Sequence, residues 1–148
     1  MSEAKLTATQ LERAYKALSK VPYVTLLGIE LEDIGMGTAT LMLPVRKELM
    51  QNHGVVHGGA VASLIDSAMA FAIIPLLSAD EKVTTVDLTI SYLRPVTEGQ
   101  MTASAKVIRA GRRLISVSAE VFNSDQSLTA TALSTYIRLS GSSITTRG

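Results

Sequence analysis

Asp66 is the only formally charged side chain between Glu48 and Asp80, and it lies midway along an apolar, alanine-rich stretch. Burying an ionised carboxylate costs roughly several kcal/mol or more unless the group is paired, hydrogen-bonded or protonated. Two interpretations stay open: a catalytic carboxylate, or one neutralised by an interior partner such as an arginine or a group of backbone amides. Asp66 is therefore the first candidate for a reactive group.

The second candidate is the tripeptide His57-Gly58-Gly59, at the point where a loop is expected to become a helix. Glycines let another molecule approach the free N–H groups of a helix start, and the helix dipole favours negative charge there. Such a position suits an oxyanion that develops during acyl transfer. The alternative is that the paired glycines only allow close packing of the helix start.

The spacing of these two candidates has a geometric consequence. Nine residues separate His57 from Asp66, which on a helix is about 13.5 Å of rise and nearly half a turn of rotation. The two cannot meet within one chain. A two-fold dimer with antiparallel helices would bring the helix start of one subunit beside the carboxylate of the other, so the spacing predicts a homodimer if both are catalytic.

Two other kinds of site are disfavoured. His53 and His57 are four residues apart, but Gly54 argues against a helix that presents both rings, and the chain has no cysteine to complete a zinc site. We therefore expect no metal and no cofactor. Ser63 and Ser67 fall on the expected helix without a strand-to-helix nucleophile elbow, which argues against a serine triad.

Composition narrows the possible partners. A chain of 148 residues, 47% of them apolar, suits one domain at 1–140 with a flexible tail at 141–148. A net charge of +1 and 4% aromatic residues give no basic field or stacking platform for nucleic acid, and no membrane partner is expected. Residues 1–5 do not resemble a signal peptide, so a cytoplasmic location is expected.

Hydrophobic periodicity predicts an α+β domain. The long helix is apolar on all sides, which is typical of a helix surrounded by protein. Short turn-rich connections at 98–99, 110–111 and 123–125 predict that strands consecutive in the sequence are antiparallel neighbours. The expected elements are a helix at 9–19, strands at 29–34 and 39–43, the long helix at 56–74, and strands at 83–93, 101–108, 114–122 and 128–139.

The segment Gln51-Asn52-His53-Gly54-Val55-Val56-His57-Gly58-Gly59, followed by Leu64 and Asp66, resembles the signature of hotdog-fold acyl-CoA thioesterases of the phenylacetate-pathway (PaaI-like) type. The resemblance covers nearly the whole chain and includes residues 27–29, 37, 85–88 and 92–95. It implies a curved antiparallel sheet wrapped around one long central helix, an acyl-CoA substrate, and homodimers that often pair into tetramers.

The resemblance also implies roles for individual residues. Gly58 would donate its N–H to the thioester carbonyl, and Asp66 of the partner subunit would act as nucleophile or as general base. His57 would orient the donor region, and the Thr85 hydroxyl would assist the attacking water. An active-site amide would come from Gln51 or from its neighbour Asn52.

Three arginines, Arg94, Arg112 and Arg113, are candidates for contacts with the CoA phosphates, the alternative being solvated turn charges. Small and flexible residues at 68–71 and 73 would line an acyl pocket or belong to the core. An alternative function is a non-catalytic hotdog module that binds acyl-CoA. A hotdog hydratase would need a different histidine-bearing loop, which the sequence does not contain.

Overall fold

The computed structural model describes residues 5–140. The expected tail at 141–148 lies outside the described residues. Strands and the long helix occur where periodicity predicts them, to within a few residues. The elements are α1 (Ala8–Ser19), α2 (Pro22–Leu27), β1 (Glu30–Gly35), β2 (Thr38–Pro44), η1 (Lys47–Leu49), α3 (Gly58–Ile73), η2 (Ile74–Leu76), β3 (Glu81–Tyr92), β4 (Gln100–Ala110), β5 (Leu114–Phe122) and β6 (Leu128–Ser140).

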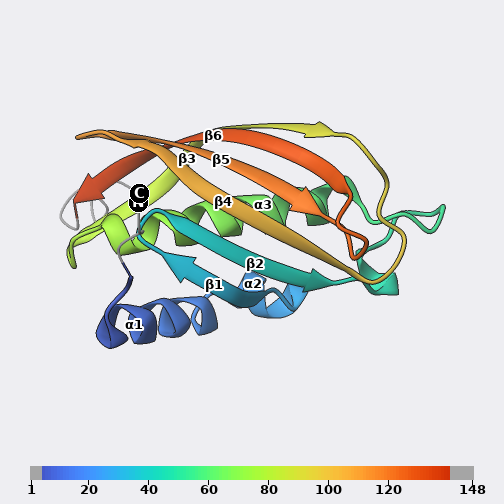
Figure 1. Ribbon diagram of the computed structural model, residues 1–148, viewed down its shortest axis with the longest axis horizontal. Helices are drawn as coiled ribbons and strands as arrows, with labels where there is room; N and C mark the ends of the chain where they lie inside the picture. Colours follow the sequence, from blue (N-terminus) through green and yellow to red (C-terminus); the bar gives the residue numbers. More distant parts are fainter. Residues whose placement is uncertain (1–4, 141–148) are drawn as a thin grey trace, which may run out of the picture.

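The six strands form one antiparallel sheet in the order β1-β2-β4-β5-β6-β3. The sheet curves around α3, which runs along its concave face, while α1 and α2 lie beside β1 (Figure 1). Inward-facing side chains alternate along the strands, as in β2, where Ala39, Leu41 and Leu43 are buried. The predicted α+β architecture, a sheet around one helix, is confirmed.

The prediction that consecutive strands pair is wrong for β3 and β4. β3 lies at the sheet edge and pairs with β6, whereas β4 lies between β2 and β5. The chain does not turn back after β3, because the N–H groups of Leu93 and Arg94 bond to the Thr129 carbonyl and the Val96 carbonyl accepts from Val56. These bonds direct residues 93–99 past the start of α3 to the middle of the sheet (Figure 1).

The core is built on α3, whose buried residues include Leu64 and Ile65. Ala68, Met69, Phe71 and Ile73 are buried among core residues. Of the two alternatives for this run, the structure therefore favours core. Within the described residues, one helical stretch, Gly58–Leu76, is long and apolar enough to cross a membrane. It is this central helix, and packing against the sheet accounts for its apolar composition.

One stripe of α3 is only partly buried within the single chain, which modifies the expectation of a helix surrounded on all sides. Ala62, Ser63, Asp66, Ser67 and Ala70 recur at helical spacing and have intermediate exposure. The candidate carboxylate therefore lies on a face of the helix that the chain's own sheet covers only in part.

Two helices precede the sheet. The Thr7 side chain and the Gln10 side chain form a capping box at the start of α1, whose position agrees with the predicted helix. The second helix, α2, has six residues and is not among the elements expected from the sequence. Pro22 begins α2 and Gly28, with φ of +85°, ends it in the left-handed conformation that favours glycine.

Candidate active site

The start of α3 is shaped by a histidine cap. His57 is the N-cap residue, and its Nδ1 accepts a hydrogen bond from the Gly59 N–H at 2.8 Å. A Cβ at position 59 would lie 2.9 Å from that nitrogen, so the cap requires glycine there. The N–H of His57 in turn donates to the Leu49 carbonyl at 2.8 Å, which fixes the entry of the chain into the helix.

Gly58 is the first residue of α3, and its N–H has no acceptor within the part of the chain that the structure describes. The adjacent Gly59 N–H is already used by His57, so Gly58 carries the donor that stays available. The Gly58 carbonyl accepts from the Tyr92 hydroxyl at 2.9 Å, which ties the helix start to the end of β3. The helix N-terminus therefore presents a fixed, unpaired donor.

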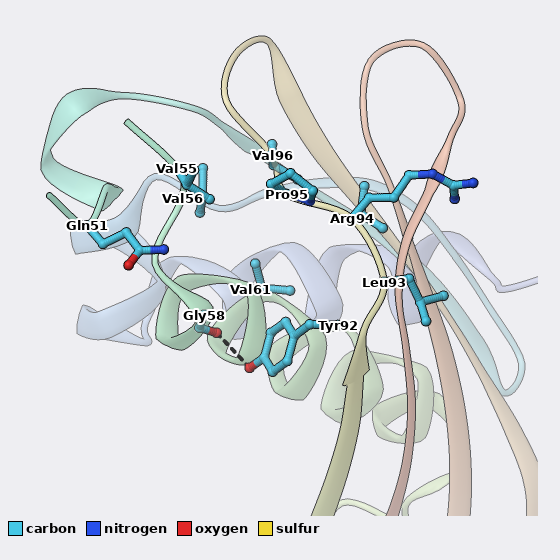
Figure 2. A pocket seen from close by; sticks show the side chains of 11 residues that line it. Gln51, Val55, Val56, Gly58, Val61, Tyr92, Leu93, Arg94, Pro95 and Val96 are labelled. Atoms are coloured by element: carbon cyan, nitrogen blue, oxygen red, sulfur yellow. Dashed lines mark hydrogen bonds between the residues drawn. The ribbon is translucent and has the colours of Figure 1, made fainter. Parts of the chain in front are cut away.

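A cavity of about 300 Å³ lies directly against Gly58. Its size is at the lower end of the range for small-molecule sites. Figure 2 shows the Gly58 carbonyl bonded to the Tyr92 hydroxyl at the helix start, with Gln51 on one side of the cavity and Arg94 on the other. Gln51 lines the cavity and Asn52 does not, so of the two expected amides the structure brings Gln51 to Gly58.

The Asp66 carboxylate has two hydroxyl donors, both on the same oxygen. The Tyr136 hydroxyl lies 2.6 Å from Oδ1 and the Thr85 hydroxyl lies 2.9 Å from it. Oδ2 has no partner within residues 5–140. Neither an arginine nor a group of backbone amides, the partners that a purely structural carboxylate was expected to have, is among these contacts. Asp66 therefore keeps Oδ2 available, while Oδ1 is held in part by Thr85, the residue whose hydroxyl the resemblance expects to assist the attacking water.

A β-bulge in β3 makes this contact possible. Thr85 and Tyr92 are seven residues apart, and a regular strand would place them on opposite faces. The register of β3 with β6 shifts between Thr85 and Asp87, which restores both side chains to the α3 side. The Asp87 carboxylate accepts the Thr135 N–H at 2.9 Å at this irregularity. One strand thus contacts both the helix start and Asp66.

Sequence reasoning missed Tyr136 as a site residue. Its side chain is only 2% exposed, and its hydroxyl contacts both the carbonyl and the carboxylate of Asp66. Burial, together with the hydrogen bond to the Asp66 carboxylate and that group's charge, raises the pKa of Tyr136 well above its ordinary value. One signal in the sequence could have identified it: Tyr136 is at an inward position of the last strand, and a buried hydroxyl needs a polar partner.

The three candidate arginines lie at two ends of the sheet. Arg94 lines the cavity beside Gly58 and donates to the Leu128 carbonyl at 2.7 Å. Arg112 and Arg113 lie in the turn between β4 and β5, where Leu114 pairs with Ile137. Seven ladder positions along β6 separate that end from Ala130, the partner of Tyr92, which is about 23 Å. The structure does not bring the three together within one chain.

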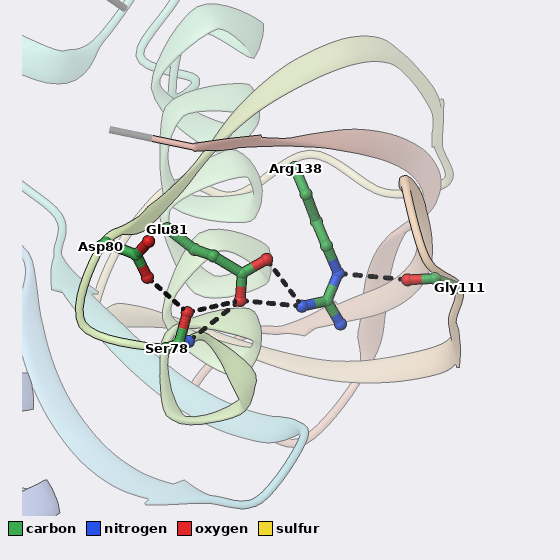
Figure 3. Close-up of polar contacts among 5 residues, drawn as sticks. All are labelled: Ser78, Asp80, Glu81, Gly111 and Arg138. Carbon is green, nitrogen blue, oxygen red and sulfur yellow. Dashed lines mark hydrogen bonds and ion pairs between the residues drawn. The ribbon is translucent and has the colours of Figure 1, made fainter. Parts of the chain in front are cut away.

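The turn that carries Arg112 and Arg113 is held by Arg138. Its Nε donates to the Gly111 carbonyl at 3.1 Å, and its Nη1 lies 3.1 Å from Oε1 of Glu81 (Figure 3). Hydrogen bonds from the Ser78 backbone and from Arg138 lower the pKa of Glu81. This cluster ties the start of β3 to the β4–β5 turn and so fixes where the two candidate arginines are presented.

The described residues contain no group of three or more His, Cys, Asp or Glu side chains able to hold a metal ion.

The residues 53–130, which include His57, Gly58, Asp66 and Thr85, match the thioesterase superfamily. The chain belongs to the thioesterase superfamily. Its architecture is the hotdog fold, as the resemblance implied.

Three relatives illustrate this thioesterase's place in the family. The medium/long-chain acyl-CoA thioesterase YigI of Salmonella typhimurium is 30% identical over 154 residues, covering 90% of this chain and 97% of that protein. The PaaI protein from the phenylacetic acid degradation operon of Escherichia coli superposes with a TM-score of 0.85 at 25% identity, covering 93% and 98% of the two chains. A thioesterase of Haemophilus influenzae superposes with a TM-score of 0.83 at 25% identity, covering 97% and 98%.

These likenesses support the PaaI-like type expected from the sequence. They also favour the enzyme over the binding module, because the family, YigI and the Haemophilus influenzae protein are thioesterases. The prediction that this thioesterase is an enzyme is therefore confirmed. The roles of its individual site residues and its oligomeric state stay predictions.

Proposed function

We propose that this thioesterase hydrolyses acyl-CoA at two identical sites of a homodimer, each formed by Gly58 of one subunit and Asp66 of the partner subunit. The observation that carries the proposal is a complementary pair of unpaired groups. Gly58 offers an N–H donor beside a cavity, and Asp66 offers the free Oδ2 of a carboxylate. Acyl transfer needs one group to stabilise the oxyanion and another to activate the attack.

One chain cannot supply both groups to the same thioester. Gly58 and Asp66 lie on one helix, eight residues apart, which corresponds to about 12 Å of rise. A reacting carbonyl must lie within about 3 Å of its oxyanion donor and close to the attacking atom. The helix is packed on the sheet along its length and cannot fold to shorten this distance. The second group therefore comes from another chain.

The free edge of β3 provides a way to bring the second chain. β3 has 12 residues, and among residues 5–140 it pairs through one side, with β6. Its other side carries N–H and C=O groups that no other described strand pairs. A two-fold antiparallel pairing of β3 with its copy, centred between Leu88 and Thr89, would set Thr85 of one subunit beside Tyr92 of the partner subunit. Since Thr85 contacts Asp66 and Tyr92 contacts Gly58, both shared sites form at once.

In the proposed reaction the Asp66 carboxylate takes a proton from water, and the water oxygen attacks the thioester carbonyl carbon. The carbonyl π electrons move to its oxygen, and the Gly58 N–H stabilises the resulting oxyanion. Collapse of this intermediate breaks the carbon–sulfur bond and expels the CoA thiolate, which receives the proton from Asp66. The products are the free acid and CoA, and the carboxylate is restored.

The same carboxylate can instead attack the thioester carbonyl carbon directly, which breaks the carbon–sulfur bond and expels the CoA thiolate to leave a mixed anhydride. Water then hydrolyses the anhydride to the free acid and the Asp66 carboxylate, and the proton released in this step goes to the thiolate. The two routes differ in the fate of the Asp66 oxygens. In a single turnover in isotopically labelled water, the anhydride route places solvent oxygen in Asp66 when water attacks the acyl carbon of Asp66. General-base catalysis leaves Asp66 unlabelled and places the label in the product acid. Mass spectrometry of the peptide containing Asp66 detects label in that residue, and its presence after one turnover establishes the anhydride route.

Acyl-CoA as the substrate rests on the relatives and on the placement of the arginines. YigI is a medium/long-chain acyl-CoA thioesterase, and Arg94 lines the cavity beside Gly58. In the proposed dimer, Arg112 and Arg113 of the partner subunit lie at the same end as that subunit's Asp66. The two-fold arrangement therefore gathers positive charge from both chains around one site, which suits the CoA phosphates.

We extend the proposal to a dimer of dimers. The outer face of the sheet carries exposed apolar side chains, among them Ile108 at 58% and Leu133 at 59% exposure. Exposed apolar side chains mark interfaces between subunits where they form a contiguous patch, so the extension requires these side chains to pack together across a second interface. Native mass spectrometry or light scattering distinguishes a dimer from a tetramer.

Replacement of Asp66 by asparagine tests the proposed function. The amide can act neither as base nor as nucleophile, so Asp66→Asn should lower kcat for acyl-CoA hydrolysis by roughly 10²–10⁴-fold without loss of the dimer. Asp33→Asn, an exposed position in β1, is the matched control and should retain full turnover. A folded, dimeric Asp66→Asn protein with undiminished hydrolysis across an acyl-CoA panel would contradict the proposal.

A further inference from the structure

The two oxygens of the Asp66 carboxylate are in different environments. Oδ1 lies 2.6 Å from the Tyr136 hydroxyl and 2.9 Å from the Thr85 hydroxyl. Oδ2 has no hydrogen-bond partner in the described part of the chain. A carboxylate that turns freely about its terminal torsion samples a broad range of orientations. Here two donors on one oxygen restrict that rotation.

Tyr136 is well suited to act as a permanent donor. Its ring is 2% exposed, and its hydroxyl contacts Asp66 through both the carboxylate and the main-chain carbonyl. Burial and the neighbouring negative charge raise the pKa of the phenol, so the hydroxyl keeps its proton. A hydroxyl that donates to a carboxylate makes a short, charge-assisted hydrogen bond, and the 2.6 Å separation agrees with one.

The backbone places Tyr136 and Thr85 together. The two residues are cross-strand partners in the β3–β6 ladder, directly before the bulge. Both side chains therefore project toward α3 at the same level and reach the same carboxylate oxygen. Thr85 lies on the sheet edge and is exposed, whereas Tyr136 approaches Asp66 from the buried side.

We infer that Tyr136 is a positioning residue for hydrolysis: by holding Oδ1 of Asp66 from the core side, it directs Oδ2 toward the thioester and the attacking water. The inference rests on the proposed function of Asp66. Tyr136 does not touch the substrate in this arrangement. It acts by keeping the reactive oxygen in a productive orientation before the substrate binds, which lowers the entropic part of the barrier.

The variant Tyr136→Phe tests the inference because it keeps the buried ring and removes only the hydroxyl. We expect kcat to fall by about 10- to 100-fold, the effect of losing one charge-assisted hydrogen bond, while KM changes by less than about twofold. Tyr15→Phe, an exposed tyrosine of α1, is the matched control and should have the kinetics of the unmodified protein. An unchanged kcat, or a rise in KM without a fall in kcat, would overturn the inference.

A second variant keeps the test decisive if Tyr136→Phe folds poorly. Thr85→Val removes the other donor from an exposed strand position, and it should lower kcat about tenfold with little change in KM. If both hydroxyls serve to orient the carboxylate, the two single variants give the same kinetic pattern. A Thr85→Val protein with unchanged kcat contradicts the orientation of Asp66 through Oδ1.

The double variant separates action through Asp66 from a general structural effect. In the Asp66→Asn background, Tyr136→Phe should change the residual rate by less than about twofold, because groups that act as a unit are not additive. A further tenfold loss there would show that Tyr136 acts by another route and overturn the inference. Full activity of Asp66→Asn alone would instead defeat the proposed function, so the two failures are distinguishable.

Discussion

Two tyrosine hydroxyls tie α3 to the sheet, and the regions that they hold differ in character. At the helix start, Tyr92 is 55% exposed and donates to the Gly58 carbonyl beside an open cavity. At the middle of the helix, Tyr136 is 2% exposed and donates to Asp66. The start presents an unpaired donor built from backbone, and the middle presents an unpaired acceptor built from a side chain held by the core.

In the proposed dimer, this difference explains why each region would be half of a site. A donor made from the first N–H of a helix needs an open approach and little support beyond the cap by His57. A carboxylate in an apolar helix needs hydrogen-bond partners, and one of those of Asp66, Tyr136, lies deep in the fold. The two requirements are met at different depths and at different points along one rigid helix. In the proposed dimer, the two-fold partner would combine them.

The largest expected effect comes from mixing two inactive variants. Gly58→Pro removes the N–H donor and Asp66→Asn removes the base, so each homodimer should be inactive or nearly so. In a heterodimer of the two, one site has both lesions and the other has neither. Co-expression at equal levels with different affinity tags should therefore restore about a quarter of the unmodified activity by random pairing.

The control for this experiment is a single chain that carries both lesions, co-expressed with itself. It should give no recovery, because every site then contains at least one lesion. Tandem affinity purification verifies that the mixed heterodimer is present. If it then shows no recovery of activity, Gly58 and Asp66 of the same chain act in one site. That result would break the comparison between the two regions as halves of a shared site.

The helix start can be tested alone with a pair of substitutions at Gly58. Proline fits the first position of a helix, and the preceding His57 has φ of −62° and ψ of 135°, a conformation compatible with a following proline. Gly58→Pro should therefore fold and yet lower kcat by roughly 10²–10³-fold, the cost of losing one oxyanion donor. Steady-state kinetics on an acyl-CoA substrate measure it.

Gly58→Ala is the matched control, because it adds a Cβ but keeps the N–H. The added carbon would lie 3.4 Å from the Tyr92 ring, an ordinary contact. Most of the activity should therefore survive in this variant. If alanine and proline at position 58 lower kcat equally, the space beside Tyr92 matters and the donor does not.

Much of the candidate site could be predicted from local sequence. Asp66 was identifiable because a lone charge in an apolar helix needs an explanation, and Gly58 because glycines at a helix start expose its donors. Their separation followed from helix geometry alone. Each of these inferences uses residues on one element, where spacing in sequence converts directly into position in space.

The parts that could not be predicted depend on contacts between distant segments. Turn-rich connections suggested that β3 pairs with β4, whereas β3 pairs with β6. That pairing sets Tyr136 beside Thr85, and no local pattern reveals it. The bulge after Thr85 could not be predicted either, since alternation alone puts Thr85 and Tyr92 on opposite faces of the strand. Tyr136 was therefore missed although it is the shortest contact of Asp66.

The smallest expected effect is on the protein's free energy of unfolding at alkaline pH, through Tyr136 at the middle of α3. The pKa of Tyr136 is raised in the folded protein by burial and by Asp66, whereas an unfolded tyrosine titrates near pH 10. Above about pH 10 the unfolded chain releases this proton and the folded chain keeps it. The free energy of unfolding should then fall as pH rises, by at most about 1.4 kcal/mol per pH unit from this group.

Tyr136→Phe has no such proton to release, so its stability should depend less steeply on alkaline pH than that of the unmodified protein. Urea unfolding at about pH 9 and about pH 11 measures both slopes, and the difference between the two proteins isolates Tyr136 from the other titrating groups. Tyr15→Phe, which changes an exposed hydroxyl, should leave the slope of the unmodified protein intact. Equal slopes for Tyr136→Phe and the unmodified protein would mean that the Tyr136 phenol ionises as readily in the folded as in the unfolded protein. The contrast between the buried middle of α3 and its open start would then lose its electrostatic basis.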